Sequence, residues 1–365
     1  MTHSTATLTT FTSVQIPTTM GLDLSDRVSE FLVLRGDDHK LEAGKVCMTR
    51  EPLSEVFTRW KGCRLVIEAG GHSPWVSRLA AACGMEVVVA NPRRVELISK
   101  NDRKSDRVDA EILARLGKSD VGLLWPITHR GEEAQSDIAI RDARNFEVSQ
   151  RTAAINFVRG KLKSSGYRAE TCSPESFHTR VLRDIPPQLE PALLPIVEGI
   201  AKINQTIKNF DKQIEVLCEE RYPVTQLLQQ VPGVGPLGSL SFVLTIDDPK
   251  RFEDGRDVGA YLGLVPRKKD SGNSSPQLGI SKAGDREMRR LLVLSANYIL
   301  GRFGPDSDLR RFGLRIAAQG GKRGKKRARV AVARKLAVLM HHLWITGELY
   351  DPLYLAKKRG EIAAA

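Results

Sequence analysis

The first third of this chain is constrained most by short apolar segments that alternate with helical patterns. Residues 63–69, CRLVIEA, form a continuous apolar run that is typical of a strand covered on both faces. Strand patterns occur in four segments: 20–24, 29–36, 63–69 and 85–92. Helix patterns occur at 74–84 and 103–117, and each of them ends at a glycine. The alternation predicts an α/β domain with a mixed sheet over residues 19–125.

The rest of the chain is predicted to be mainly helical. Residues 126–222 begin at a proline and contain two long amphipathic stretches, which predict an antiparallel coiled-coil arm. Residues 223–345 form a third unit, which contains the turn VPGVGP. We interpret this turn either as a helix-hairpin-helix-like phosphate contact or as an ordinary helix connector. Residues 1–18, rich in threonine, are expected to be a disordered tail, and residues 346–365 a C-terminal tail.

The charge of the chain predicts a nucleic-acid partner. Lysine and arginine number 56 against 43 aspartate and glutamate, a net charge of +13, and a basic excess favours polyanions. The basic residues cluster in residues 322–335, which we expect to start as a Gly-punctuated loop and continue into a helix that binds the phosphate backbone. Predicted nucleic-acid contacts are Lys322, Arg323, Lys325, Lys326, Arg327 and Arg329 in this segment, with Arg267, Lys268, Lys269, Lys282 and Arg286 before it. The arm adds a basic face with Arg141, Arg144, Arg151 and Arg159, for which dimerisation of the arm is the alternative role.

The cysteines and the apolar runs indicate in which cellular compartment the protein is expected. Five scattered cysteines without a CxxC pair argue against a disulfide framework and against a zinc site. No apolar run approaches the roughly 20 residues of a membrane span. The N-terminal residues lack the basic start and the apolar core of a signal peptide. We therefore expect a cytoplasmic protein without membrane contact.

Carboxylates in the first domain are candidate metal ligands, namely Asp23, Glu68, Asp106 and Asp109. Asp106 and Asp109 are three residues apart and share one side of a helix. Asp23, placed in the middle of the first strand, and Glu68, at the end of the third, suit a crevice at a sheet edge. Two Mg²⁺ ions would neutralise such a cluster and assist phosphoryl transfer. Spacing alone leaves helix capping as an alternative role, and it leaves Asp26 and Asp102 as rival ligands.

Several motifs resemble one family in their residues and in their order. GLDLSD, VIEAGG and RKSDRVDAEILARL resemble the RuvC-like domain of DEDD-type insertion-sequence transposases. VPGVGPLGSLSF and the segment from FEDGRDVGAYLGLVPRKKDSGNSS to DREMRRLL resemble the transposase domain of that family. The resemblance runs from about residue 19 to residue 345. This family includes pilin-gene-inverting recombinases and bridge-RNA-guided recombinases.

The resemblance implies a RuvC/RNase H-like fold for the first domain and a role for individual residues. Asp23, Glu68, Asp106 and Asp109 match the tetrad of the family, and Asp102 falls outside its Asp-x-x-Asp-Ala signature. Ser271, which precedes Gly272, matches the nucleophilic serine, and Asp285 stands where asparagine is common. From the residues alone Ser271 is ambiguous, because other serines lie nearby at 274, 275 and 281.

The function implied by the resemblance is Mg²⁺-dependent exchange of DNA strands through a serine–DNA intermediate. The implied partners are donor and target DNA, a structured guide RNA and further copies of the chain, in a dimer or a tetramer whose protomers could share active sites. Three alternatives stay open: a Holliday-junction resolvase or nuclease that uses water, a non-catalytic nucleic-acid-binding scaffold, and an actin-like ATPase. The ATPase is disfavoured because no Gly-rich phosphate loops follow the first strand.

Overall fold

The structure is a computed structural model that describes residues 18–92, 105–267, 269, 276 and 278–360. It divides the chain into two compact units, Met1–Arg130 and Gly131–Ala365. Within the described ranges, no helix is both long enough and apolar enough to cross a membrane. The predicted N-terminal tail lies outside the described residues, apart from Thr18.

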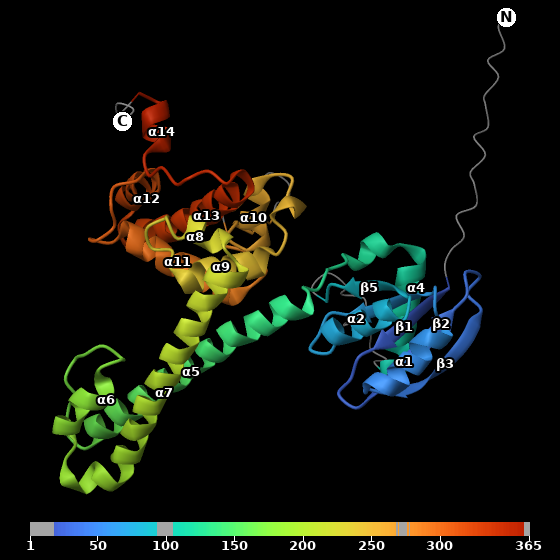
Figure 1. Ribbon diagram of the computed structural model, residues 1–365, viewed down its shortest axis with the longest axis horizontal. Helices are drawn as coiled ribbons and strands as arrows, with labels where there is room; N and C mark the ends of the chain where they lie inside the picture. The colour runs from blue at the N-terminus through green and yellow to red at the C-terminus, as the bar shows by residue number, and fades with distance from the viewer. Residues whose placement is uncertain (1–17, 93–104, 268, 270–275, 277, 361–365) are drawn as a thin grey trace, which may run out of the picture. The chain divides into compact units, whose positions relative to one another are not determined.

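The first unit is built on a mixed sheet, as the sequence predicted, and this sheet has five strands (Figure 1). Its strands are β1 (Thr19–Asp23), β2 (Val28–Leu34), β3 (Lys40–Cys47), β4 (Arg64–Glu68) and β5 (Glu86–Ala90). Their order in the sheet is β3-β2-β1-β4-β5. The pairs β1–β2 and β2–β3 are antiparallel, whereas β1–β4 and β4–β5 are parallel. The central strands β1 and β4 therefore run in the same direction and end at the same edge.

Helices cover both faces of this sheet. On one face, Leu65 and Ile67 of β4 join a core with residues of α1 (Arg50–Arg59) and α2 (Ser73–Ala82). On the other face, Val66 packs with Leu113 of α4 (Asp106–Ser119) and with the 3-10 turn Val121–Leu124. The apolar run of β4 is thus buried from both sides, which confirms the prediction for residues 63–69.

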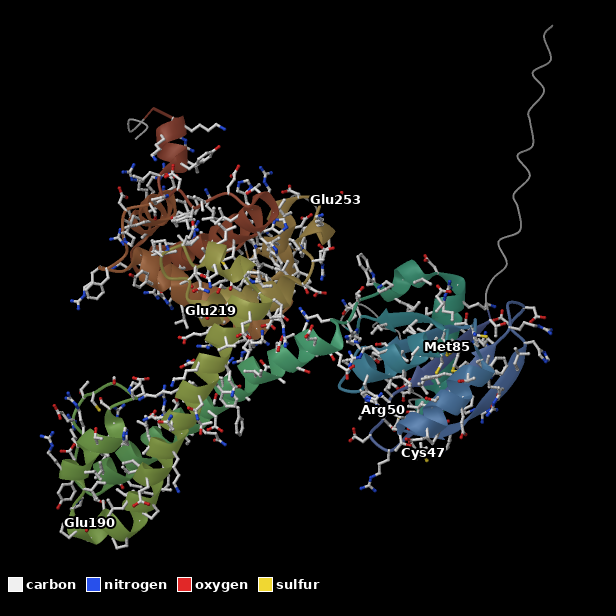
Figure 2. All side chains as sticks on the ribbon, viewed as in Figure 1. Cys47, Arg50, Met85, Glu190, Glu219 and Glu253 are labelled. Carbon is white, nitrogen blue, oxygen red and sulfur yellow. The ribbon has the colours of Figure 1, made fainter. Side chains whose placement is uncertain are left out.

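Two predictions for this unit need correction, and two of its elements were missed. Asp23 is the last residue of β1, not its middle. The strand β3 and the helix α1 were not predicted; in Figure 2 the labels Cys47 and Arg50 mark the end of β3 and the start of α1. The helix predicted for residues 103–117 does not end at Gly117, because α4 (Asp106–Ser119) continues to Ser119.

Gly117 and Gly21 let α4 lie directly on the sheet. A Cβ atom on Gly117 would lie 2.2 Å from Val66 Cγ2, and one on Gly21 would lie 2.0 Å from the carbonyl oxygen of Ala110. At the far end of α4, the Arg64 guanidinium donates a 2.8 Å hydrogen bond to the Gly117 carbonyl. Arg64 begins β4, so α4 runs antiparallel to β1 and β4. The first turn of α4 consequently lies toward the carboxyl ends of these two strands.

We expect Gly21→Ala to destabilise the first unit, because the new methyl group would meet the backbone of α4. Overpacking of this kind costs about 1–3 kcal/mol of unfolding free energy. Gly71→Ala is the matched control, since a Cβ atom there meets nothing within 4 Å. Urea unfolding of both variants measures the difference, and equal midpoints would show that α4 does not need the glycine.

The second unit begins with two long helices, α5 (Glu132–Ser164) and α7 (Glu190–Val216), which pack against each other. Arg144 pairs with Asp211 over 2.7 Å and Arg151 with Asn204 over 2.9 Å, so the numbering rises along one helix as it falls along the other. The helices are therefore antiparallel, as predicted; a heptad coiled coil stays a prediction. Their connection contains α6 (Phe177–Arg180) and the 3-10 turns Val181–Asp184 and Pro187–Leu189.

The remainder of the second unit is helical around one apolar core (Figure 1). A π turn (Leu217–Arg221) leads to α8 (Val224–Leu228), α9 (Pro236–Ile246), the 3-10 turn Pro249–Arg251, α10 (Gly255–Tyr261), α11 (Arg286–Leu300), α12 (Asp308–Ala318), α13 (Gly321–Thr346) and α14 (Tyr354–Lys358). The helix α12 was not predicted. The basic segment predicted to start as a loop is helical from Gly321 onward. Its Gly324 allows this, since a Cβ atom there would lie 2.8 Å from the Ala317 carbonyl oxygen of α12.

Candidate active site and nucleic-acid interface

Asp23 and Glu68 lie at the carboxyl ends of adjacent parallel strands. The last paired residues of β1 and β4 are Leu22 and Ile67, so Asp23 and Glu68 are the next positions of the same register. Both side chains are half-buried. This edge of a parallel pair is where α/β sheets commonly bind ligands.

Asp106 and Asp109 come to the same edge on the first turn of α4. The helix starts at Asp106 because the Ser105 hydroxyl caps it and accepts a hydrogen bond from the Val108 amide. Asp106 is exposed, whereas Asp109 is 4% exposed. Since α4 runs antiparallel to β1 and β4, the backbone brings all four predicted carboxylates to one edge of the sheet.

The carboxylates fit a divalent cation by their chemistry, because hard oxygen ligands are those that Mg²⁺ and similar ions prefer. In the described part of the chain, no three His, Cys, Asp or Glu side chains are grouped so that they could hold one ion. The backbone thus sets the positions of the ligands, and the side chains would have to turn toward one another to coordinate metal. The rival Asp102 lies outside the described residues.

Two loops that follow the carboxylate-bearing strands are tied together by His72 and Asp26. His72 Nε2 lies 3.3 Å from Asp26 Oδ1, and the Trp75 indole N–H donates to His72 Nδ1 over 3.2 Å. Because Nδ1 accepts the bond from Trp75, a neutral His72 carries its proton on Nε2. Nε2 can then donate to Asp26. The side chain of Asp26 is 99% exposed, and it links the turn after β1 to the loop after β4.

The loop after Glu68 is also held in place by hydrogen bonds of Ser73, which in turn contacts His129. The Ser73 hydroxyl donates to the Gly70 carbonyl over 2.8 Å and accepts from the Gly70 amide over 2.9 Å. Its oxygen lies 2.9 Å from His129 Nε2. Sequence reasoning missed His72, Ser73 and His129; the Ser-Pro start of α2 was the one local signal.

Stability at mildly acidic pH is expected to depend on His129. Burial lowers the pKa of this imidazole, and the positive charges of Arg78 and Arg130 lower it further. The unfolded chain then binds a proton first, so the free energy of unfolding should fall as pH drops below about 6.5 and through the folded pKa. Urea unfolding at about pH 7.5 and about pH 5.5 should show a smaller pH effect in His129→Gln than in the wild type. The exposed His39→Gln is the control, and an unchanged pH effect in His129→Gln would contradict the assignment.

The predicted serine loop is anchored at both of its ends. Ser271 and Lys268 lie outside the described residues. On either side, Pro266 and Ile280 form an antiparallel bridge, and the Arg267 amide donates to the Gly279 carbonyl over 3.0 Å. Of the cations predicted here, Arg267, Lys269, Lys282 and Arg286 are exposed. The two ends of the loop are therefore held together.

The arginines of α5 do not form the exposed basic face that was predicted. Arg141 is 4% exposed and pairs with Asp142 and Asp285; Arg151 is 8% exposed and pairs with Asn204. Arg144 is bound to Asp211. These side chains hold the unit together and do not offer free guanidinium groups to a phosphate. Arg159 alone of the predicted four is exposed, above the ring of Phe177.

The cationic side chains in the first half of α13 are exposed, unlike most of the predicted arginines of α5. Its predicted contacts Arg323, Lys325, Lys326, Arg327 and Arg329 are all exposed, and the side chain of Lys322 lies outside the described part. Among the described residues, none of these five cations takes part in an ion pair. An exposed cluster of cations without acidic neighbours is the pattern expected of a phosphate-binding surface.

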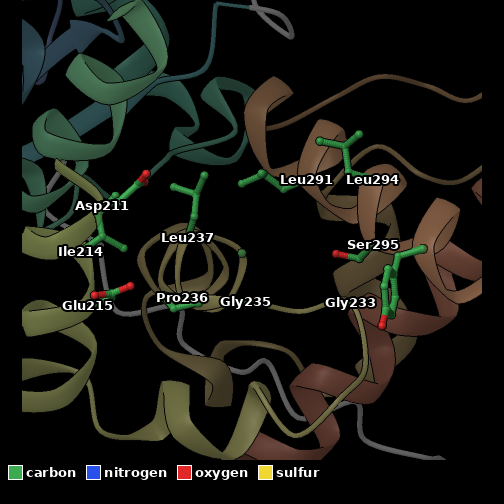
Figure 3. Close-up of a pocket in the computed structure, with 12 residues that line it drawn as sticks. Asp211, Ile214, Glu215, Gly233, Gly235, Pro236, Leu237, Leu291, Leu294 and Ser295 are labelled. Carbon is green, nitrogen blue, oxygen red and sulfur yellow. The ribbon is translucent and has the colours of Figure 1, made fainter. Parts of the chain in front are cut away.

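The VPGVGP turn borders a cavity of about 440 Å³ in the second unit (Figure 3). Gly233, Gly235 and Pro236 line it together with Asp211 and Glu215 of α7. Glu215 beside the turn opposes the approach of a phosphate, whereas the charge of Asp211 is paired with Arg144. The helix-hairpin-helix contact therefore stays a prediction that its surroundings do not favour.

Comparison with known proteins places both units in one family. A family model described as "Transposase IS116/IS110/IS902 family" matches residues 225–311, and a DEDD-type model described as "Transposase" matches residues 20–166. The transposase for insertion sequence element IS1111A of Coxiella burnetii is 28% identical over 91% of this chain and 90% of its own length. A probable family 20 transposase of Pseudomonas aeruginosa is 27% identical over 91% of this chain and 98% of its own. The pilin gene-inverting protein of Moraxella lacunata is 24% identical over 76% of this chain and 78% of its own.

These matches agree with the geometry described above. The DEDD-type match contains all four carboxylates, and a DEDD transposase domain implies the use of divalent metal. Transposases also bind DNA, in keeping with the free cations of α13. The chain belongs to the DEDD-type family of insertion-sequence transposases, which are enzymes that transfer DNA strands.

Proposed function

We propose that this transposase cuts and exchanges DNA strands through a phosphodiester bond between Ser271 and DNA, with Mg²⁺ held by Asp23, Glu68, Asp106 and Asp109. The observation that carries the proposal is the position of the four carboxylates. Three separate segments, β1, β4 and α4, bring them to one edge of the mixed sheet. The match to the DEDD-type model over residues 20–166 supports the same residues as a functional set.

The carboxylates would act by binding and orienting metal. Two bound Mg²⁺ ions would supply positive charge that favours deprotonation of an attacking hydroxyl and stabilises the leaving oxygen. Asp109 is suited to a fixed position, because it is buried on a helix whose backbone at Ala110 lies directly against Gly21 of β1. Asp23 and Glu68 gain support from the loops that His72 and Ser73 tie together.

The serine reaction exchanges one phosphodiester for another. The Ser271 hydroxyl loses its proton, its oxygen bonds to a DNA phosphorus, and the bond from that phosphorus to one DNA oxygen breaks. The released oxygen takes a proton and becomes a DNA hydroxyl. In the second step a DNA hydroxyl attacks the same phosphorus, the bond to the serine breaks, and the serine regains its proton. No outside energy source is needed, since the number of phosphodiester bonds stays constant.

We further propose that the exposed cations of α13 bind a structured RNA that directs the choice of donor and target DNA, within a dimer or a tetramer. The unpaired cations Arg323, Lys325 and Arg329 support a phosphate-binding role. The test is to purify the full chain from cells and sequence the RNA that accompanies it. A discrete RNA species supports the guide, and a sample with only degraded bulk RNA contradicts it.

A charge-matched pair of triple variants sharpens this test. Replacing Arg323, Lys325 and Arg329 with alanine should weaken RNA binding, and the slope of log affinity against log salt should fall by roughly 0.7–0.9 for each phosphate that the protein no longer binds. The control removes three exposed lysines of α7, Lys202, Lys208 and Lys212. Equal losses of affinity in both triple variants would show that net charge, not the α13 surface, binds the RNA.

A further inference from the structure

A wide groove crosses the second unit beside the ends of the serine loop. It has a volume of about 1150 Å³ and lies between α12, α13 and the chain segment that leads into α14. Its floor is apolar and includes Phe312, Ile316 and Val330. Pro266 and Ile280, the bridged residues at the two ends of the serine loop, form part of its wall. The groove therefore lies beside the two described ends of the serine loop.

Cations without acidic partners stand on the rim of this groove. They are Arg256 on α10 and Lys326, Arg327 and Arg334 on α13. In the described part of the chain, none of the four takes part in an ion pair. The two aspartates that also line the groove are engaged within the protein: Asp308 accepts from the Leu355 amide, and Asp351 binds Lys357. The groove thus offers four cations that have no ion-pair partner among the described residues.

Lys335 also lines the groove and adds a further cation to it. Its ammonium group lies 4.2 Å from the centre of the Phe312 ring. Burial lowers its pKa, and the nearby charges of Arg315 and Arg359 lower it further. An anion in the groove would be attracted to this ammonium group. The apolar floor at the same place favours a ligand that carries a flat apolar group beside its anionic group.

Aromatic side chains are available on the wall opposite α13. Tyr354 is 57% exposed although it lines the groove, and Tyr350 lies in the same segment. This segment is fixed to α12, because the Asp308 amide donates to the Pro352 carbonyl over 2.7 Å. An exposed aromatic ring on a fixed segment is a suitable platform for a nucleobase.

We propose that the groove binds one unstacked nucleobase of a DNA strand, with the adjoining phosphates on the rim cations. The inference rests on the proposed function, because it takes the occupant to be the strand that Ser271 cuts. An apolar helix of a partner protein fits the groove less well, since it would bury four cations without supplying acids. A base with its two flanking phosphates satisfies the floor and the rim together.

The test is photocrosslinking of the full-length protein to a single-stranded DNA of about eight nucleotides that carries one 4-thiothymidine. Peptide mapping should place the crosslink in residues 349–355 or at Phe312. A competitor with an abasic site at that position should compete about tenfold less well than the intact strand. Crosslinks found only in peptides outside the groove, or equal competition by the abasic strand, would overturn the proposal.

A pair of alanine-to-leucine variants tests the groove itself. Ala331 lines the groove, so Ala331→Leu should fill its floor and lower the crosslink yield about fivefold to a hundredfold. Ala153→Leu, on an exposed position of α5, should leave the yield unchanged. Leucine suits both helices, so neither variant is expected to disturb folding. Equal yields in the two variants would contradict the site.

Three further outcomes decide between this inference and the proposed function. A crosslink formed with 4-thiouridine RNA but not with DNA would assign the groove to RNA and overturn the proposal as stated. Groove crosslinks that persist in a protein with no serine–DNA adduct would support the groove while removing the serine mechanism. A normal adduct without groove crosslinks would remove only the nucleobase site.

Discussion

Ser271→Ala is expected to abolish the covalent protein–DNA adduct while RNA binding survives. The reason is that alanine removes the only atom proposed to bond to phosphorus and changes no charge. The measurement uses end-labelled DNA and a denaturing gel, on which a covalent complex migrates with the protein. The loss should be complete within detection, because water in place of serine would release DNA without leaving an adduct.

Neighbouring serines provide the controls for this experiment. Ser274→Ala and Ser275→Ala change the same loop by the same atom, and both should keep the adduct. A normal adduct yield in Ser271→Ala would refute the serine assignment, and loss of the adduct in one control would move the assignment to that residue. DNA cutting by the wild type without any adduct would favour the resolvase that uses water.

Asp23→Ala and Asp106→Ala are each expected to remove Mg²⁺-dependent recombination. Loss of one positioned electrostatic group typically lowers a rate by about a hundredfold to a thousandfold. Recombination between two plasmid-borne sites, measured over a Mg²⁺ titration, would show the loss, and calorimetry would show weaker Mg²⁺ binding.

The control for the carboxylates is Glu55→Ala, which removes one exposed carboxylate from α1 of the same unit. It should recombine normally, and thermal unfolding should show that all three variants are folded. Full activity in either aspartate variant would contradict the assignment of that residue as a metal ligand.

The sequence predicted best the elements whose apolar patterns are strong. The continuous run of β4 and the two long amphipathic stretches that form α5 and α7 needed no tertiary information. The strand β3 was missed because it lies at the sheet edge, pairs only with β2, and has mostly exposed side chains. Gly117 was misread as a helix end because glycine usually has that role. Here its missing side chain makes room for Val66 instead.

The candidate site depended on more than local patterns. Spacing put Asp106 and Asp109 on one side of a helix, but only the family resemblance preferred the four carboxylates over Asp26 and Asp102. The arginines of α5 could not be assigned from the sequence, because a helical pattern does not distinguish a face in water from a face against another helix. Arg151 meets Asn204, a partner 53 residues away, and His129 meets Ser73 from 56 residues away. Such long-range pairs leave no local signal.

The buried polar pairs between α5 and α7 fix the position of each helix along the axis of the other. A slip of one helical turn, about 5.4 Å, would separate Arg151 from Asn204 and leave a buried guanidinium without its amide partner. Asp137, which is 2% exposed, would likewise lose Arg221. The helix pair therefore cannot slide, and an insertion or deletion in α5 has to be matched by an equal one in α7. Relatives whose α5 is longer or shorter should therefore have an α7 that is longer or shorter by the same number of residues. The distance between the two ends of the helix pair then changes only when both helices change together.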